Sequence, residues 1–149
     1  MVMDAYRKAQ DLLARRPHFV AELRKKLQTR GFPAEDVEAS LGRLMELGYL
    51  DDLAHGRQLA REYLWRRGYG RLMIIQRLRR KGVEPSLARR ITDELFAAVA
   101  PVELEELFSR LVPKAGRDLY AYLYRRGFLP EEIEPFVARS RQEDVQDNP

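Results

Sequence analysis

One ten-residue pattern occurs three times in this chain. Each copy carries apolar residues four apart, then basic residues, a glycine and a further apolar residue; the copies are residues 23–32, 74–83 and 119–128. The pattern predicts the end of an amphipathic helix, because glycine readily takes the left-handed conformation there and the next apolar residue packs back onto the last turn. Gly31, Gly82 and Gly127 are 51 and 45 residues apart, a spacing typical of a helical repeat array.

The apolar spacing is helical along the whole chain, and no stretch alternates as a half-buried strand does. We therefore expect an all-α protein: three tandem three-helix repeats that form an elongated, curved array, since each unit alone buries little core. The expected units are residues 1–49, 50–99 and 100–142, followed by a frayed tail at 143–149. Their expected helices are 4–16, 19–30 and 34–47; 51–67, 71–81 and 85–98; and 102–112, 116–126 and 130–142.

Shared helix faces indicate which side chains form the core. In the first unit these faces carry Ala5, Ala9, Leu12, Leu13, Phe19, Leu23, Leu27, Val37, Leu41 and Leu44. On the second helix of the middle unit, we expect the buried side to hold Leu72, Ile74, Ile75 and Leu78. The basic residues of that helix must then face outward.

Charge is distributed unevenly along the array. The formal net charge of +4 combines about 0 over residues 1–56, +9 over 57–90 and −5 over 91–149. The middle segment holds 11 Lys and Arg against 2 Asp and Glu. Such a local excess is the footprint expected of a phosphate-binding surface, although a solvated helix face rich in arginine is the simpler alternative. The near absence of acids favours an anionic partner.

The candidate binding residues follow from this charge. The basic set that we expect to contact nucleic acid or a nucleoprotein filament comprises Arg57, Arg61, Arg66, Arg67, Arg71, Arg77, Arg79, Arg80 and Lys81. Arginine can hold phosphate with two parallel hydrogen bonds, and no base-reading pattern accompanies the set. Aromatic residues that could stack on bases or form a protein interface are Trp65, Tyr69, Tyr122 and Tyr124. Core packing is the stronger explanation for most of the aromatics, including Tyr63 and Tyr120.

Several classes of function have no support in the sequence. The chain has no cysteine, and His18 and His55 lack partners at the spacing of a catalytic dyad. Asp51 and Asp52 precede a helix and are expected to cap it rather than bind metal. No phosphate-loop, dinucleotide or zinc-protease motif occurs. We expect no enzymatic activity, no cofactor and no metal.

No apolar run is long enough for a membrane span, and the first residues turn charged at once, so no secretory signal is expected. The expected protein is therefore a cytoplasmic monomer with no membrane partner.

Several stretches of this sequence resemble, in order and spacing, those of the RecX regulatory proteins of bacteria. They are residues 9–18, 22–27 and 44–52, the string Arg67-Gly68-Tyr69-Gly70, and residues 78–83. The resemblance covers about residues 5–141. It implies a non-enzymatic modulator that binds in the groove of the RecA recombinase filament on single-stranded DNA. It also implies that the protein blocks filament extension and ATP hydrolysis during DNA repair and recombination. The basic set of the middle unit would then be the contact surface, and direct contact with DNA, single-stranded or duplex, would be possible.

Three residues depart from the family pattern. Phe19 stands where a capping hydroxyl is usual, which costs about 1 kcal/mol at that helix end. His55 and Gly56 stand where an aromatic residue and alanine are usual, and glycine inside a helix costs about 1 kcal/mol relative to alanine. These changes are expected to lower the local stability of the first two units without changing the fold.

Two other classes of function stay open from the residues alone. A stand-alone nucleic-acid-binding module would explain the basic stretch equally well and would bind bare DNA with a steep salt dependence. A hydrolytic enzyme is disfavoured by the missing dyads and triads.

Overall fold

The structure is a computed structural model that describes residues 2–146, the last of them by its backbone alone. Within that range the chain is helical and contains no strand. The helices are α1 (Val2–Arg15), α2 (Val20–Thr29), α3 (Ala34–Glu46), α4 (Asp52–Trp65), α5 (Arg71–Arg80), α6 (Pro85–Ala97), α7 (Pro101–Leu111), the short 3₁₀ helix η1 (Val112–Lys114), α8 (Leu119–Arg125) and α9 (Pro130–Gln146).

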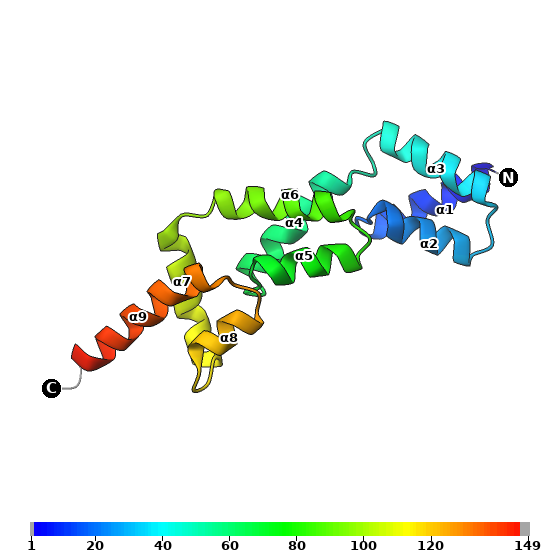
Figure 1. The fold of residues 1–149 in the computed structure, drawn as a ribbon. Coiled ribbons are helices and arrows are strands. Elements are labelled where there is room, and N and C mark those ends of the chain that lie inside the picture. The colour runs from blue at the N-terminus through cyan, green and yellow to red at the C-terminus, as the bar shows by residue number, and fades with distance from the viewer. Residues whose placement is uncertain (1, 147–149) are drawn as a thin grey trace.

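The three-helix units follow one another along an elongated, bent array, with α1 and α9 toward opposite ends (Figure 1). This arrangement confirms the all-α repeat fold predicted from the sequence. Between residues 2 and 146, no helix has the length and apolar character needed to cross a membrane.

Two helix boundaries differ by more than two residues from those predicted, and the others lie within two residues of the expected positions. Helix α8 starts at Leu119, three residues later than expected, because Asp118 has extended backbone and its carboxylate accepts a hydrogen bond from the Ala121 N–H at 2.9 Å. Helix α9 continues to Gln146, past the predicted end at 142, since no glycine or proline interrupts residues 140–146. The fraying predicted from residue 143 is therefore not seen up to 146. The remainder of the predicted tail, 147–149, lies outside the described residues.

The three repeated helix ends have the predicted geometry. Gly31, Gly82 and Gly127 all have positive φ, between +86° and +100°. After each glycine, the next N–H donates to the carbonyl of the last buried leucine of the helix; the pairs are Phe32 with Leu27, Val83 with Leu78, and Phe128 with Leu123. Val83 and Phe128 are buried, and Phe32 is half-buried, so the apolar residue packs back as expected.

The buried side chains form two separate cores. The smaller core joins α1, α2 and α3 through Leu23, Leu27, Leu41 and other apolar residues predicted from the periodicity. The larger core runs through α4 to α9 and so unites the second and third units. Phe19, which immediately precedes α2, also belongs to the larger core.

The prediction that Leu72 faces the core is wrong: its side chain is 53% exposed. Residues two apart on a helix point to nearly opposite sides, so Leu72 and Ile74 cannot both be buried. Ile74 and Leu78, four apart, form the buried stripe of α5.

The second and third units meet through their backbones. The Gly70 N–H donates to the Arg126 carbonyl at 2.8 Å, and the Leu72 N–H donates to the Gly127 carbonyl at 3.0 Å. A Cβ atom built on Gly70 would lie 2.3 Å from the Phe128 nitrogen, and one on Gly127 would lie 2.5 Å from the Met73 nitrogen. Only glycine at positions 70 and 127 allows these two backbone segments to approach so closely.

Candidate nucleic-acid interface

Helices α4 and α5 and the turn between them carry the basic set predicted from the sequence. Three members of the set already contact other residues of the protein. Arg57 pairs with Glu94 of α6 at 2.9 Å, and its hydrogen bonds, together with those of Arg90, lower the pKa of Glu94. Arg71 pairs with Asp93 and lies over the Phe96 ring. Arg77 lies over the ring of Tyr69, 4.8 Å from its centroid.

A second group of the set is free to meet a ligand. The side chains of Arg61, Arg66, Arg79 and Arg80 are exposed and form no hydrogen bond or ion pair with the rest of residues 2–146. Arg79 and Arg80 line a shallow groove on α5 together with the exposed Leu72. This free group of four arginines, spread over α4 and α5, is the part of the predicted surface that can neutralise phosphates at least cost.

Arg67 and Lys81 occupy the two ends of the middle unit. The Arg67 side chain is exposed, while its carbonyl accepts a hydrogen bond from Arg126. Lys81 lies in a pocket at the junction with the first unit, beside Glu22 and Arg16.

Tyr69 has an internal role that charge analysis did not reveal. Two guanidinium groups, those of Arg77 and Arg126, lie over its ring, at 4.8 and 5.1 Å from the centroid. Arg126 also donates to the Gly68 carbonyl at 2.9 Å and lies over the ring of Tyr122. These contacts fix the turn at 67–70, one of the strings that resemble the family pattern, as the junction between units. Arg126 was missed because basic residues before a repeated glycine are also expected simply from the helix dipole.

The other candidate aromatics differ in exposure. Tyr122 is half-buried beneath Arg126, and Trp65 is half-buried at the end of α4. Tyr124 is 55% exposed and stacks on Tyr120, with ring centroids 6.3 Å apart. Of the two tyrosines Tyr122 and Tyr124, which lie two apart on α8, only Tyr124 is exposed. Tyr63 is buried, as predicted.

The three residues that depart from the family pattern lie together at the junction of the first and second units. The Phe19 and His55 rings have centroids 4.2 Å apart. A Cβ atom on Gly56 would lie 2.6 Å from Ile91 Cδ1 and 3.7 Å from Phe19 Cε1. Phe19 therefore fills a space in the core of the second unit that Gly56 helps to leave open. The expectation of a simple local loss of stability did not include this packing.

Asp51 and Asp52, which follow α3, cap two different helices. Asp51 caps its own helix, α4, by accepting from the Ala54 N–H at 3.0 Å, as predicted. Asp52 accepts from the Val20 N–H at 2.9 Å and so caps α2 of the preceding unit. Burial raises the pKa of Asp52, and this hydrogen bond only partly offsets the effect. The contact supplies part of the capping that Phe19 does not provide.

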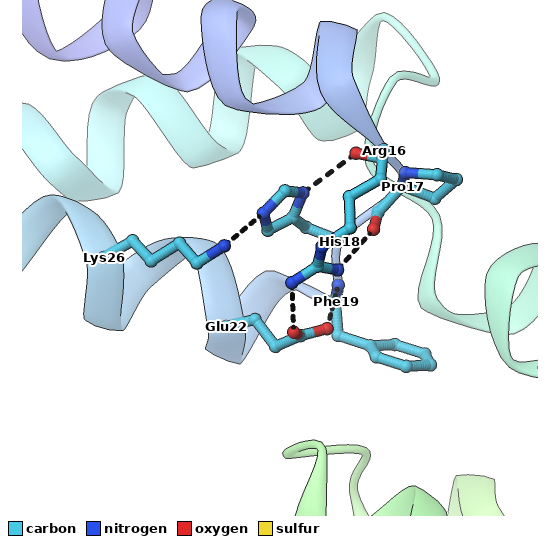
Figure 2. Close-up of polar contacts among 6 residues, drawn as sticks. All are labelled: Arg16, Pro17, His18, Phe19, Glu22 and Lys26. Atoms are coloured by element: carbon cyan, nitrogen blue, oxygen red, sulfur yellow. Dashed lines mark hydrogen bonds and ion pairs between the residues drawn. The ribbon is translucent and has the colours of Figure 1, made fainter.

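His18 has a structural role at the same junction (Figure 2). It is buried, with Nδ1 2.9 Å from the Arg16 carbonyl and Nε2 2.8 Å from Lys26 Nζ. Because the ammonium can only donate, Nε2 accepts and Nδ1 carries the proton of a neutral ring. Burial lowers the pKa of His18, and the charges of Arg16 and Lys26 lower it further.

Glu22 completes this cluster. It accepts from the Phe19 N–H at 3.2 Å and pairs with Arg16 at 3.1 Å, as Figure 2 shows. Burial opposes its ionisation, but these contacts and the charge of Lys81 outweigh that effect and lower its pKa. One half of a capping box is thus present although the hydroxyl half is missing.

Comparison with known proteins identifies relatives over most of the chain. Residues 5–44 match the family model described as RecX, first three-helix domain. The protein named Regulatory protein RecX from Pelodictyon phaeoclathratiforme is 34% identical over 128 residues, covering 83% of this chain and 80% of that protein. The protein of the same name from Syntrophotalea carbinolica is 30% identical over 151 residues, covering 93% and 97%.

Solved structures show the same fold. The crystal structure of RecX from Lactobacillus salivarius superposes with a TM-score of 0.79 at 17% identity, covering 93% of this chain and 95% of that one. A second crystal structure, of a regulatory protein RecX, gives a TM-score of 0.78 at 23% identity and covers 92% of this chain and 71% of that one.

Proposed function

The chain belongs to the RecX family of regulatory proteins, and on this premise we propose that it binds the RecA recombinase filament on single-stranded DNA and inhibits it. The steps that we propose it inhibits are filament extension, ATP hydrolysis and recombinase activity. We further propose that the protein acts without catalysis, as a monomer in the cytoplasm, and that its partners are the recombinase and DNA.

The observation that carries this proposal is the combination of free arginines and acidic surface on one elongated body. Arg61, Arg66, Arg79 and Arg80 have no internal partner within residues 2–146 and lie in the middle unit. The segment from residue 91 onward has a net charge of −5. A ligand that presents phosphates beside basic protein, as a nucleoprotein filament does, complements both surfaces at once. Bare DNA complements only the first.

The proposed mechanism is steric and electrostatic. The middle unit contacts phosphate or acidic protein, and exposed carboxylates of the third unit contact a basic surface of a neighbouring recombinase subunit. The backbone contacts at Gly70 and Gly127 hold these two units as one body. A body that spans neighbouring subunits hinders the movements that ATP turnover requires.

The experiment adds the purified protein to preformed filaments and measures ATP hydrolysis. Hydrolysis should fall as the protein is titrated in and should recover with the variant Arg79→Glu/Arg80→Glu. Unchanged hydrolysis at saturating protein would exclude the proposed inhibition.

The second candidate function is a nucleic-acid-binding module without a recombinase contact, and the four free arginines favour it to the same degree. The two functions differ in the role of the carboxylates on α7 and α9. Glu106→Lys/Glu143→Lys should weaken filament binding and leave binding to bare single-stranded DNA unchanged or stronger if the recombinase is the partner. Tight binding of the unmodified protein to bare DNA, with no preference for filament, would favour the module.

A further inference from the structure

A cleft in the third unit lies between α7 and α9 and is closed at one side by Phe96 and Val99, which precede α7. Its walls are largely apolar and include Phe96, Val99, Leu104, Phe108 and Phe136. Phe108 belongs to the larger core, whereas Val99, Leu104 and Phe136 are only partly buried. The cleft is therefore an opening onto the core that can receive an apolar side chain.

Carboxylates surround the apolar walls of this cleft. Each basic group near the cleft is already neutralised, since Arg139 pairs with Glu105 and Arg71 pairs with Asp93. Glu131 and Glu132 line the cleft without an ion pair among the described residues. Glu132 accepts from the Leu129 N–H at 2.8 Å; burial raises its pKa, an effect that this bond and the charge of Arg71 only partly offset. The rim thus keeps an excess of negative charge.

The opposite side of α7 has the same character. A second hollow there contains Trp65, Val102 and Glu106, with Arg110 beside three carboxylates, and Glu105 lines both hollows. Val102 is 59% exposed. Helix α7 is therefore flanked on two sides by apolar surface bordered by carboxylates, a combination that repels phosphate and suits a protein partner.

We propose that the cleft between α7 and α9 receives an apolar side chain from a segment of the recombinase that also carries lysine or arginine. This inference rests on the proposed function and names the docking point on the third unit. The apolar side chain fills the space between Leu104 and Phe136, and the neighbouring basic groups of the partner pair with Glu131 and Glu132. Charge complementarity thus selects a basic segment, and the apolar floor selects one with an exposed anchor.

The test compares two charge reversals on one helix. Glu131→Lys changes the rim of the cleft, whereas Glu134→Lys makes the same change at an exposed position of α9 that does not line it. A third variant, Val99→Trp, fills the cleft. Binding is measured at about 0.15 M salt, where charges farther than roughly 8 Å are screened. The probes are recombinase filament on single-stranded DNA with a non-hydrolysable nucleotide, and the bare single-stranded DNA.

Glu131→Lys and Val99→Trp should each weaken filament binding by about fivefold or more, and Glu134→Lys should change it less than twofold. Binding to bare DNA and the thermal unfolding midpoint should stay unchanged for Glu131→Lys, which separates docking from folding. Equal weakening by Glu131→Lys and Glu134→Lys, or no weakening by either, would overturn the cleft as the docking point.

Two outcomes concern the identity of the partner. If the unmodified protein binds no filament, the proposed function itself fails, and the recombinase is excluded as the occupant. If light scattering shows self-association that Glu131→Lys abolishes, the occupant is a second copy of the chain, whose exposed Leu72 lies beside Arg79 and Arg80. That result would also overturn the proposal.

Discussion

The ring of Phe19 lies against the imidazole of His55, with centroids 4.2 Å apart, although the two residues belong to different units of the array. Phe19 is the N-cap residue of α2 and provides no hydroxyl to that helix. It is nevertheless fully buried, in the core of the second unit. The residue therefore connects units instead of capping a helix.

Replacing Phe19 by serine tests this role. Phe19→Ser restores a capping hydroxyl worth about 1 kcal/mol but removes a buried ring, a loss of about 3–5 kcal/mol for truncation to alanine. The expected net result is a loss of roughly 2–4 kcal/mol in the free energy of unfolding, measured by urea denaturation. A variant as stable as the parent would show that the cap, rather than the ring, is what matters at this position.

Gly56 should tolerate alanine only when Ile91 is shortened. Gly56→Ala gains up to about 1 kcal/mol of helix propensity, but the new methyl group would lie 2.6 Å from Ile91 Cδ1. We expect Gly56→Ala alone to be neutral or destabilising by about 1 kcal/mol. In the Ile91→Val background, which lacks Cδ1, the same change should be stabilising. Additive effects in the double-mutant cycle would argue against the close contact.

Gly70→Ala should damage the junction of the second and third units. The added Cβ would lie 2.3–2.4 Å from backbone atoms of Gly127 and Phe128, which cannot move aside as a side chain can. The expected loss is about 3 kcal/mol or more in the free energy of unfolding. Gly42→Ala on α3 is the matched control, since nothing lies within 4 Å of its Cβ, and it should be stabilising by up to about 1 kcal/mol. Similar thermal midpoints for the two variants would contradict the close approach.

Stability should fall as the pH drops below about 6.5. Burial lowers the pKa of both His18 and His55 from the ordinary value of 6.5, so the unfolded chain takes up protons first and gains stability relative to the fold. The raised pKa of Asp52 and Glu132 opposes this loss only at lower pH, nearer the ordinary range of carboxylates. Urea midpoints at pH 7.5 and 5.5 measure the effect. His18→Asn/His55→Leu should have the smaller drop, and an equal drop would assign the effect to other groups.

The free arginines should contribute to salt-dependent binding and the paired ones should not. Arg79→Gln and Arg80→Gln should each reduce the slope of log affinity against log salt by about 0.7 for single-stranded DNA. Arg57→Gln, which removes a partner of Glu94, is the control and should leave the slope nearly unchanged. Fluorescence anisotropy at four or five salt concentrations provides the slopes. A larger change with Arg57→Gln would mean that its ion pair opens on binding.

Most of the fold was predictable because the same local signals occur three times. The glycine at each repeated helix end, the following apolar residue and the four-residue spacing of leucines depend on sequence positions that lie close together. The error at Leu72 arose where two stripes, 72–75–78 and 74–78, both fitted helical spacing. Only the packing of α5 against its neighbours chooses between them.

The sequence could not show which residues of the predicted interface are free to bind a ligand. Net charge identifies a basic segment, but it does not show which arginines are already paired. Arg57, Arg71 and Arg77 find their partners at Glu94, Asp93 and Tyr69, as much as 37 residues away in sequence. The contacts of Asp52 with Val20 and of Phe19 with His55 likewise cross between units. Such pairs are set by tertiary structure and leave no local pattern.

The two cores make the ends of the array mechanically unequal. The third unit shares its core with the second, so the two should unfold together and keep a fixed angle. Among the buried residues described, the first unit contributes only Phe19 to that shared core. Withdrawal of this one ring would leave a benzene-sized void beside Ile91 and would leave the first unit joined to the second mainly by polar contacts such as that of Asp52 with Val20. When the protein binds along a long curved surface, the angle between the first unit and the rest of the array is therefore the one that changes most easily.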